Sequence, residues 1–271
     1  MYNVRLIIEY NGAAFHGWQH QPGLRTVESE LKRVLSLVLR EEIRVVYAAG
    51  RTDAGVHAKG QVVNFLVSAP PDLRRLRFAV SSILKNDLAV LTADFVPLDF
   101  RARKSALARQ YSYRIENRDT PLVLDHTRVW HVPMALDIPA MARAAEAVIG
   151  HHDFTSFRGT QCAARSPLKT VLESELVVTG TMLTYRVVGT GFLKYMVRNI
   201  VGAIVEIGRG LKPVDSMGAI LAARNRRAAG VTAPAYALYL DWVRYPQNIA
   251  LHGPDPSETM SPVGPPTSPH R

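Results

Sequence analysis

The sequence predicts an α+β fold in which two similar halves form a mainly antiparallel sheet with helices on one face. Three observations lead to this prediction. Apolar and polar residues alternate in several short segments, which is typical of strands with one buried face. Stretches with apolar residues at helical spacing lie between these segments. The order of strand, helix and hairpin then recurs in the second half of the chain, which indicates a duplicated architecture.

The first half opens with a strand and continues with a helix. Val4, Leu6 and Ile8 share one face of the strand, and Asn11 begins the turn that ends it. Thr26 is a candidate N-cap, because acidic residues and then apolar residues at helical spacing follow it. The other elements expected in this half are strands at 43–48, 61–67 and 89–96 and a helix at 72–84.

The second half repeats this order. Alternation predicts a strand at 109–116, and Thr179-Gly180 predicts the turn of a hairpin between strands 172–178 and 182–188. Helices are expected at 138–149, 192–207 and 214–223, and a last strand at 237–244.

The chain therefore divides into three predicted parts. Residues 1–105 form one α+β half, and residues 106–245 form the other. Seven of the 17 prolines lie in residues 246–271, which contain few aliphatic side chains. Such a segment buries too little apolar surface to offset its ordering entropy, so we predict a disordered, Pro-rich tail.

The charge balance points to a polyanionic partner. The 271 residues include 33 Lys and Arg against 23 Asp and Glu, a formal net charge of +10. Nucleic acid is the commonest partner of such basic chains. The basic residues gather in three clusters, in which guanidinium groups can bind phosphate oxygens: Arg74, Arg75 and Arg77; Arg101, Arg103 and Lys104; Arg224, Arg226 and Arg227.

Other function classes find little support. Cys162 is the single cysteine, which excludes an intrachain disulfide and a thiol-rich zinc site. His151, His152 and Asp153 are adjacent in sequence and better explained by loop and capping roles, so we predict no metal. The segment GTGFLK matches no nucleotide-binding fingerprint. No signal peptide or membrane-spanning stretch is evident, and we expect a cytoplasmic protein.

The segment GRTDAGVHA, residues 50–58, contains the most informative carboxylate. Asp53 in this turn-forming stretch can accept backbone N–H bonds and hold the turn. Alternatively, the nearby cation Arg51 lowers its pKa and keeps it ionised, as a nucleophile or general base requires. Residue types and spacing alone leave both roles open.

The same nine residues resemble the signature of the bacterial tRNA pseudouridine synthase A family. The resemblance covers residues 2–246, because four further blocks match in the same order. These are EYNGAAFHGWQ (9–19), RQYSY (109–113), FLKYMVRNIVG (192–202) and APAYALYL (233–240). It implies a pseudouridine synthase fold built from two halves that are similar to RRM or ferredoxin-like domains.

The resemblance also implies roles for individual residues. Asp53 corresponds to the catalytic nucleophile, Tyr111 to the active-site tyrosine that stacks on uracil, and Arg198 to the basic residue that pairs with the catalytic carboxylate. Three residues are implied to bind substrate. Leu238 packs beneath the base, Arg51 fills the gap left by the extruded nucleotide, and His57 has a structural or RNA-contact role.

The implied reaction converts uridine to pseudouridine at positions 38, 39 and 40 of the tRNA anticodon stem-loop, with no cofactor and no metal. The family further implies a homodimer. Whether the aspartate attacks C6 of the base or the ribose C1′, or whether a glycal forms, stays open. Two alternatives remain: a pseudouridine synthase acting on other RNA sites, and an RNA-binding protein without activity.

Overall fold

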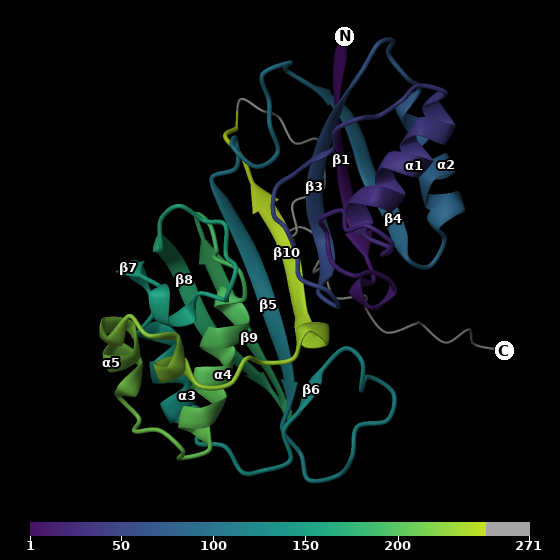
Figure 1. Ribbon diagram of the computed structural model, residues 1–271. Helices are drawn as coiled ribbons and strands as arrows, with labels where there is room; N and C mark the ends of the chain where they lie inside the picture. Colours follow the sequence, from purple (N-terminus) through teal and green to yellow (C-terminus); the bar gives the residue numbers. More distant parts are fainter. Residues whose placement is uncertain (248–271) are drawn as a thin grey trace, which may run out of the picture.

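The computed structural model describes residues 1–247, and its centre is one continuous ten-stranded sheet (Figure 1). Eight strands follow the order β4-β1-β3-β10-β5-β9-β8-β7, while β2 pairs with β3 and β6 with β5. The strands are β1 (Tyr2–Tyr10), β2 (Tyr47–Ala48), β3 (His57–Val67), β4 (Leu88–Val96), β5 (Ala108–Glu116), β6 (Trp130–His131), β7 (Gly150–Asp153), β8 (Leu168–Thr179), β9 (Met182–Gly189) and β10 (Leu238–Arg244). The α+β class and the mainly antiparallel sheet are confirmed.

The last strand joins the two halves of this sheet. β10 runs parallel to β3, with Tyr239 opposite His57, and antiparallel to β5, with Leu240 opposite Tyr111. It therefore lies between a strand from the first half of the chain and one from the second (Figure 1). Because the sheet continues through this junction, side chains 145 residues apart can meet there. The division of the chain at residue 105 stays a prediction.

In the described part of the chain, five α-helices pack against the sheet: α1 (Val27–Leu39), α2 (Leu73–Leu84), α3 (Ile138–Glu146), α4 (Met196–Gly208) and α5 (Ser216–Ala223). In Figure 1, α1 and α2 accompany β1, β3 and β4, while α3 and α4 accompany β5, β8 and β9. Thr26 caps α1 as predicted, since its hydroxyl accepts the Ser29 N–H. None of the helices within residues 1–247 has the length and apolar character needed to cross a membrane.

Three predicted elements need correction. The strand expected at 43–48 is wrong except for Tyr47–Ala48, because the N–H of Ile43 donates to the Ser36 hydroxyl instead of a neighbouring strand. The helix expected from residue 192 begins at Met196, because Tyr195 has a positive φ of 63°. The helix expected to reach residue 149 ends at Glu146, and the chain then forms β7, which the sequence did not reveal. The predicted tail lies, from residue 248 onward, outside the described residues.

Candidate active site at the junction of the two halves

Asp53 meets Arg198 at the junction of the two halves. The Asp53 loop connects β2 to β3, and Arg198 projects from the first turn of α4. Nη1 of Arg198 donates to Oδ2 of Asp53 over 3.3 Å, and its Nε donates to the Ala233 carbonyl over 2.7 Å. The two side chains are only 20% and 15% exposed, so this ion pair is largely withdrawn from water. The pairing expected from the sequence is present.

The backbone, and not the Asp53 side chain, closes the turn. The N–H of Val56 donates to the Asp53 carbonyl over 3.1 Å. Within residues 1–247, the Asp53 carboxylate accepts no hydrogen bond from the backbone of its own loop. A role in bracing the turn therefore does not explain this carboxylate.

Burial sets the direction of the Asp53 pKa. Desolvation raises the pKa of Asp53 above its ordinary value, and the positive charges of Arg198 and Lys194 offset only part of this. The expectation that Arg51 lowers this pKa is wrong, since Arg51 is exposed and the paired cation is Arg198. A poorly solvated carboxylate is a stronger base and nucleophile than one in water, so the site favours chemistry at Asp53.

Tyr111 lies on β5 beside this loop. Its side chain is buried, and its ring meets the edge of Phe192 at a centroid distance of 5.2 Å. The backbone of Gly50 approaches the hydroxyl so closely that an added Cβ would lie 3.3 Å from it. Burial raises the pKa of Tyr111 far above its ordinary value, and the nearby charge of Asp53 raises it further. The hydroxyl therefore stays protonated and can donate a hydrogen bond.

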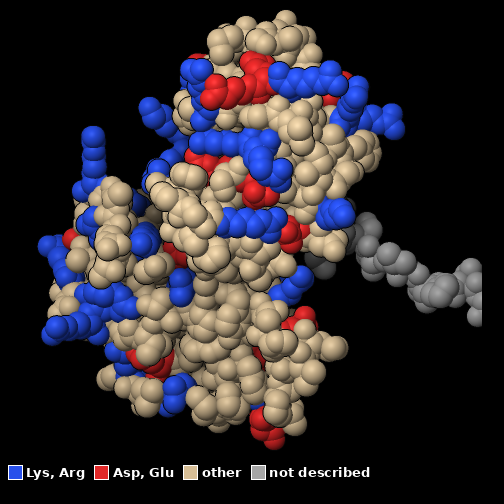
Figure 2. Space-filling model, turned by 45° about the vertical axis from the view of Figure 1, so that its right-hand side comes forward, with Lys and Arg blue, Asp and Glu red and all other residues tan. Residues whose placement is uncertain are grey.

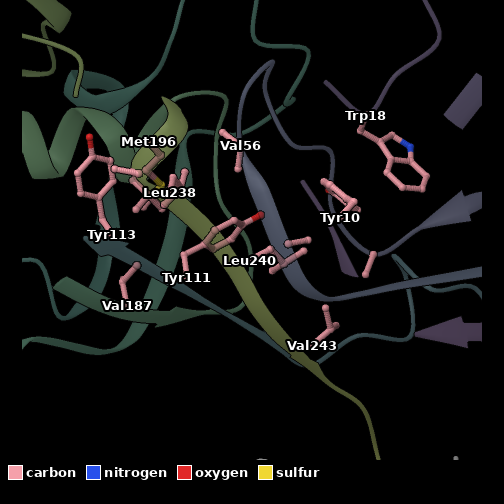
Figure 3. Close-up of a cluster of buried hydrophobic side chains, with 14 of the residues drawn as sticks. Tyr10, Trp18, Val56, Tyr111, Tyr113, Val187, Met196, Leu238, Leu240 and Val243 are labelled. Atoms are coloured by element: carbon pink, nitrogen blue, oxygen red, sulfur yellow. The ribbon is translucent and has the colours of Figure 1, made fainter. Parts of the chain in front are cut away.

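The apolar floor of the site comes from β10. Leu238 is buried opposite Tyr113 of β5, and Figure 3 shows it in the same buried cluster as Tyr111. Leu238 thus joins Tyr111 in a wall suited to the flat face of a base.

Arg51 and His57 differ in their surroundings. Arg51 is an exposed residue of the Asp53 loop, so its guanidinium group can contact a ligand that approaches from solvent. His57 is buried at the start of β3: its Nδ1 accepts the Gly12 N–H over 3.1 Å, so its Nε2 carries the proton and donates to the Tyr236 carbonyl over 3.0 Å. Burial lowers the pKa of His57, which keeps the ring neutral. Of the two roles predicted for His57, structural or RNA contact, these contacts favour the structural one.

Sequence reasoning missed the residues that hold the Asp53 loop in place. The Tyr10 hydroxyl lies 2.8 Å from the Thr52 hydroxyl, and burial raises the pKa of Tyr10 to about 12. The Gln61 amide donates to the Gly50 carbonyl over 2.7 Å. The Trp18 N–H donates to the Thr52 carbonyl over 3.0 Å. Tyr10, Trp18 and Thr52 lie in blocks that resemble the family, but the resemblance assigned them no role. The only sign of a role for Gln61 is its polar side chain inside an apolar strand.

Two neighbours of Arg198 were also missed. Tyr195 places its ring 5.0 Å from the guanidinium carbon of Arg198, and Lys194 is close enough to lower the pKa of Asp53. The positive φ of Tyr195 brings both side chains to this position before α4 begins. Gly159 permits the approach, since an added Cβ would lie 2.5 Å from the Tyr195 ring.

Some members of the basic clusters have structural contacts. Arg226 donates to the Gly230 carbonyl, to Asn199 and to Thr232, and Arg101 donates to the carbonyls of Leu98 and Phe100. These two arginines therefore have structural roles that the sequence did not reveal. Figure 2 shows Lys and Arg side chains over both halves of the molecule on the face in view.

Gly12 offers a test of how tightly the Asp53 loop must be held. A Cβ at Gly12 would lie 2.2 Å from the Val56 carbonyl oxygen, so Gly12→Ala must displace the loop or the end of β1. We expect the free energy of unfolding to fall by about 1–3 kcal/mol, and activity to fall more than the folded fraction explains. Thermal unfolding and turnover assays measure the two effects. Gly23→Ala is the control, since no atom lies within 4 Å of its added Cβ, although its φ of 73° adds a small strain. A Gly12→Ala protein with wild-type turnover would contradict the need for a tightly held loop.

The residues of the site do not form a metal centre. Within residues 1–247, no group of three or more His, Cys, Asp or Glu side chains is placed to hold a metal ion. The acid, the guanidinium and the protonated phenol are suited to covalent and general acid–base chemistry.

Comparisons with known proteins agree on one family. Residues 144–246 match the family model described as tRNA pseudouridine synthase. The chain is 44% identical over 246 residues to tRNA pseudouridine synthase A of Rhodopseudomonas palustris (strain ATCC BAA-98 / CGA009), covering 90% of this chain and 99% of the relative. It is 42% identical over 252 residues to the protein of that name from Klebsiella pneumoniae (strain 342), covering 93% of each.

A weaker likeness is found among solved structures. The crystal structure of the archaeal box H/ACA sRNP Nop10-Cbf5 complex matches with a TM-score of 0.32 and 13% identity, over 76% of this chain and 44% of that chain. At that TM-score the structural likeness adds nothing to the assignment. The sequence identity of 44% and 42% to the two relatives, over nearly the whole chain, is decisive. The chain therefore belongs to the tRNA pseudouridine synthase A family.

Proposed function

We propose that this protein is an isomerase that converts uridine to pseudouridine at positions 38, 39 and 40 of the tRNA anticodon stem-loop. Family membership supports the reaction and the tRNA substrate. One observation in the structure carries the assignment of the site: the half-buried Asp53 carboxylate, with its raised pKa, is paired with Arg198 next to Tyr111 and Leu238. Carboxylates whose pKa is shifted by burial and by a specific charged partner are found mainly at functional sites.

In the proposed reaction the C1′–N1 bond breaks, the uracil turns, and C1′ bonds to C5. N1 gains a proton and C5 loses one, so the atoms of uridine are conserved and no oxidant, reductant or cofactor is consumed. Asp53 acts as the nucleophile, at C6 of the base or at C1′ of the ribose. Arg198 holds the carboxylate in position, and Tyr111 stacks on the base and donates a hydrogen bond from its protonated hydroxyl.

The loss of the C5 hydrogen provides a direct assay. Incubation with transcribed tRNA that carries tritium at C5 of uridine is expected to release tritium to water, in an amount equal to the pseudouridine formed. The absence of release from every tRNA offered would contradict the proposed function. Release that maps to another RNA region would support a pseudouridine synthase with different targets.

We also propose that the protein works as a homodimer. An apolar loop tip supports this: Val123 and Leu124, between β5 and β6, are 73% and 92% exposed. Burial of such side chains against a second copy would remove apolar surface from water. We expect Leu124→Glu to shift the protein from dimer to monomer in light scattering. The control is Leu98→Glu, the same substitution at another exposed leucine (57%), which should leave the mass unchanged. A wild-type protein that is monomeric at assay concentrations would contradict the proposal.

A further inference from the structure

The outer face of α2 carries a cationic and aromatic cluster, which we call the α2 patch: Arg74, Arg75, Arg77 and Phe78. Phe78 is 53% exposed. The guanidinium carbons of Arg77 and Arg74 lie 5.1 and 6.0 Å from the centre of its ring. Arg74, Arg75 and Phe78 also line a shallow, open hollow, together with Asp72, whose carboxylate accepts the backbone N–H of Arg75 as the N-cap of α2. Within residues 1–247, none of the three guanidinium groups forms an ion pair with a carboxylate. Nη1 of the half-buried Arg77 donates to the Leu91 carbonyl of β4 over 3.1 Å, which leaves its other N–H groups for a ligand.

Helix stability does not account for these charges. Arg74 and Arg75 occupy the first turn of α2, at the positive end of the helix dipole, where cations are unfavourable. The first turn of α1 instead carries the acidic residues that this position favours. Arg74 and Arg77 are three residues apart, a spacing at which like charges repel. The cluster therefore persists against the local preferences of the helix.

Core packing does not account for Phe78. The buried side chains of α2 are Leu76, Val80 and Leu84, which define the face toward the sheet. Phe78 is two residues from both Leu76 and Val80, a spacing that turns its side chain to the opposite face. An exposed ring flanked by guanidinium groups suits a nucleotide, because a base can stack on the ring while its phosphates bind the cations.

The α2 patch is separate from the Asp53 site. In Figure 1, α2 lies on the outer side of the first half, beside α1 and over β4. β4 is the edge strand, three positions from β10 in the sheet. If one RNA molecule binds both places, the segment at the α2 patch must therefore differ from the segment whose uridine lies at Asp53.

We infer that the α2 patch binds a segment of the substrate tRNA outside the anticodon stem-loop, with an unpaired base on Phe78 and neighbouring phosphates on Arg74, Arg75 and Arg77. The inference rests on the proposed function, since it assigns a second contact to the same substrate. It extends that function, because the α2 patch would favour intact tRNA over the isolated stem-loop without touching the reacting uridine.

Binding to two RNAs tests this inference. The dissociation constant is measured at several salt concentrations for unmodified tRNA and for the isolated anticodon stem-loop. For Arg74→Gln/Arg75→Gln/Arg77→Gln we expect tRNA binding about tenfold weaker or more, with the slope of log K against log salt smaller by about 2–3. For Phe78→Ala we expect about tenfold weaker tRNA binding. Both variants should bind the stem-loop, and turn over saturating tRNA, within about twofold of wild type.

A charge-matched control separates the α2 patch from general electrostatics. Arg44→Gln/Arg186→Gln/Arg209→Gln also removes three positive charges, two of them from exposed ion pairs with Glu42 and Glu175, and should leave the preference for intact tRNA unchanged. The thermal midpoint of the α2 triple variant should stay close to that of wild type, because the removal of two cations from the first turn of the helix offsets the loss of the Arg77–Leu91 hydrogen bond.

Three results would overturn the inference: unchanged tRNA binding, an equal loss on the stem-loop, or an equal loss in the control. Failure of the proposed function would look different. A wild-type protein that makes no pseudouridine but binds tRNA through the α2 patch would contradict the activity and support the contact.

Discussion

Replacing Asp53 with Asn is expected to lower the rate of pseudouridine formation by about 10⁴-fold or more, the scale at which loss of a catalytic nucleophile acts. The amide has nearly the same shape as the carboxylate but cannot attack carbon or accept a proton. Single-turnover assays with excess protein measure the chemical step directly. We expect tRNA binding to stay within a few-fold of wild type.

The same substitution should not destabilise the fold. Because the folded protein raises the pKa of Asp53, the ionised carboxylate costs stability at pH values above that pKa, and the cost disappears when the group becomes neutral. The amide of the Asp53→Asn protein is neutral at every pH, so the thermal midpoint of this variant near neutrality should equal or exceed that of wild type. A large fall would mean that the loop, and not the chemistry, had been damaged.

Asp87→Asn is the matched control for this experiment. Asp87 also pairs with an arginine, Arg25, at 2.7 Å, but this ion pair is more exposed to solvent. Its loss should leave the rate within about twofold. An Asp53→Asn protein with a rate within tenfold of wild type would exclude Asp53 as the nucleophile.

Replacing Arg198 with Met is expected to lower the rate at neutral pH by about 10²–10³-fold, a loss typical of removing one charged contact from a buried site. The positive charge of Arg198 lowers the pKa of Asp53 and opposes the effect of burial. Its removal therefore raises that pKa further and leaves less of the carboxylate ionised at neutral pH. The acidic limb of the pH–rate profile should move to higher pH, and part of the activity should return under alkaline conditions.

Arg224→Met provides the comparison. Arg224 lies 3.3 Å from Asp153, the same distance as Arg198 from Asp53, but its side chain is 70% exposed. Because water screens an exposed pair, its loss should change neither the rate when all the tRNA is bound nor the pH profile, although Arg224 belongs to a cluster that can bind phosphate. Arg198→Lys keeps the charge and should retain more activity than Arg198→Met. An Arg198→Met profile with an unmoved acidic limb would contradict the coupling of the two groups.

The sequence predicted the class of fold and most of its elements because their periodic patterns are local. Where a pattern competes with a tertiary contact, it failed. Residues 43–46 alternate like a strand, but Ser36 binds the backbone of Ile43 and no neighbouring strand pairs with this segment. The helix predicted from residue 192 begins only at Met196, because Tyr195 has a positive φ that the periodicity of the sequence does not reveal.

The candidate site was predictable by resemblance but not by charge spacing. Arg51 is two residues from Asp53 in sequence, yet the cation that pairs with the carboxylate is 145 residues away. The direction of the Asp53 pKa depends on how much of the loop the second half of the chain buries, which is a property of the folded sheet. The supporting contacts of Tyr10 and Gln61 are likewise long-range. Tyr10 lies in the block at 9–19, but the resemblance assigns it no role, and Gln61 lies outside the matching blocks.

The most direct test of the account is to map pseudouridine in unmodified tRNA after incubation with the wild-type and Asp53→Asn proteins. The account predicts pseudouridine at positions 38, 39 and 40 with the wild type and none with Asp53→Asn, although both proteins bind the tRNA. Modification elsewhere in the tRNA, or modification at these positions by Asp53→Asn, would contradict it.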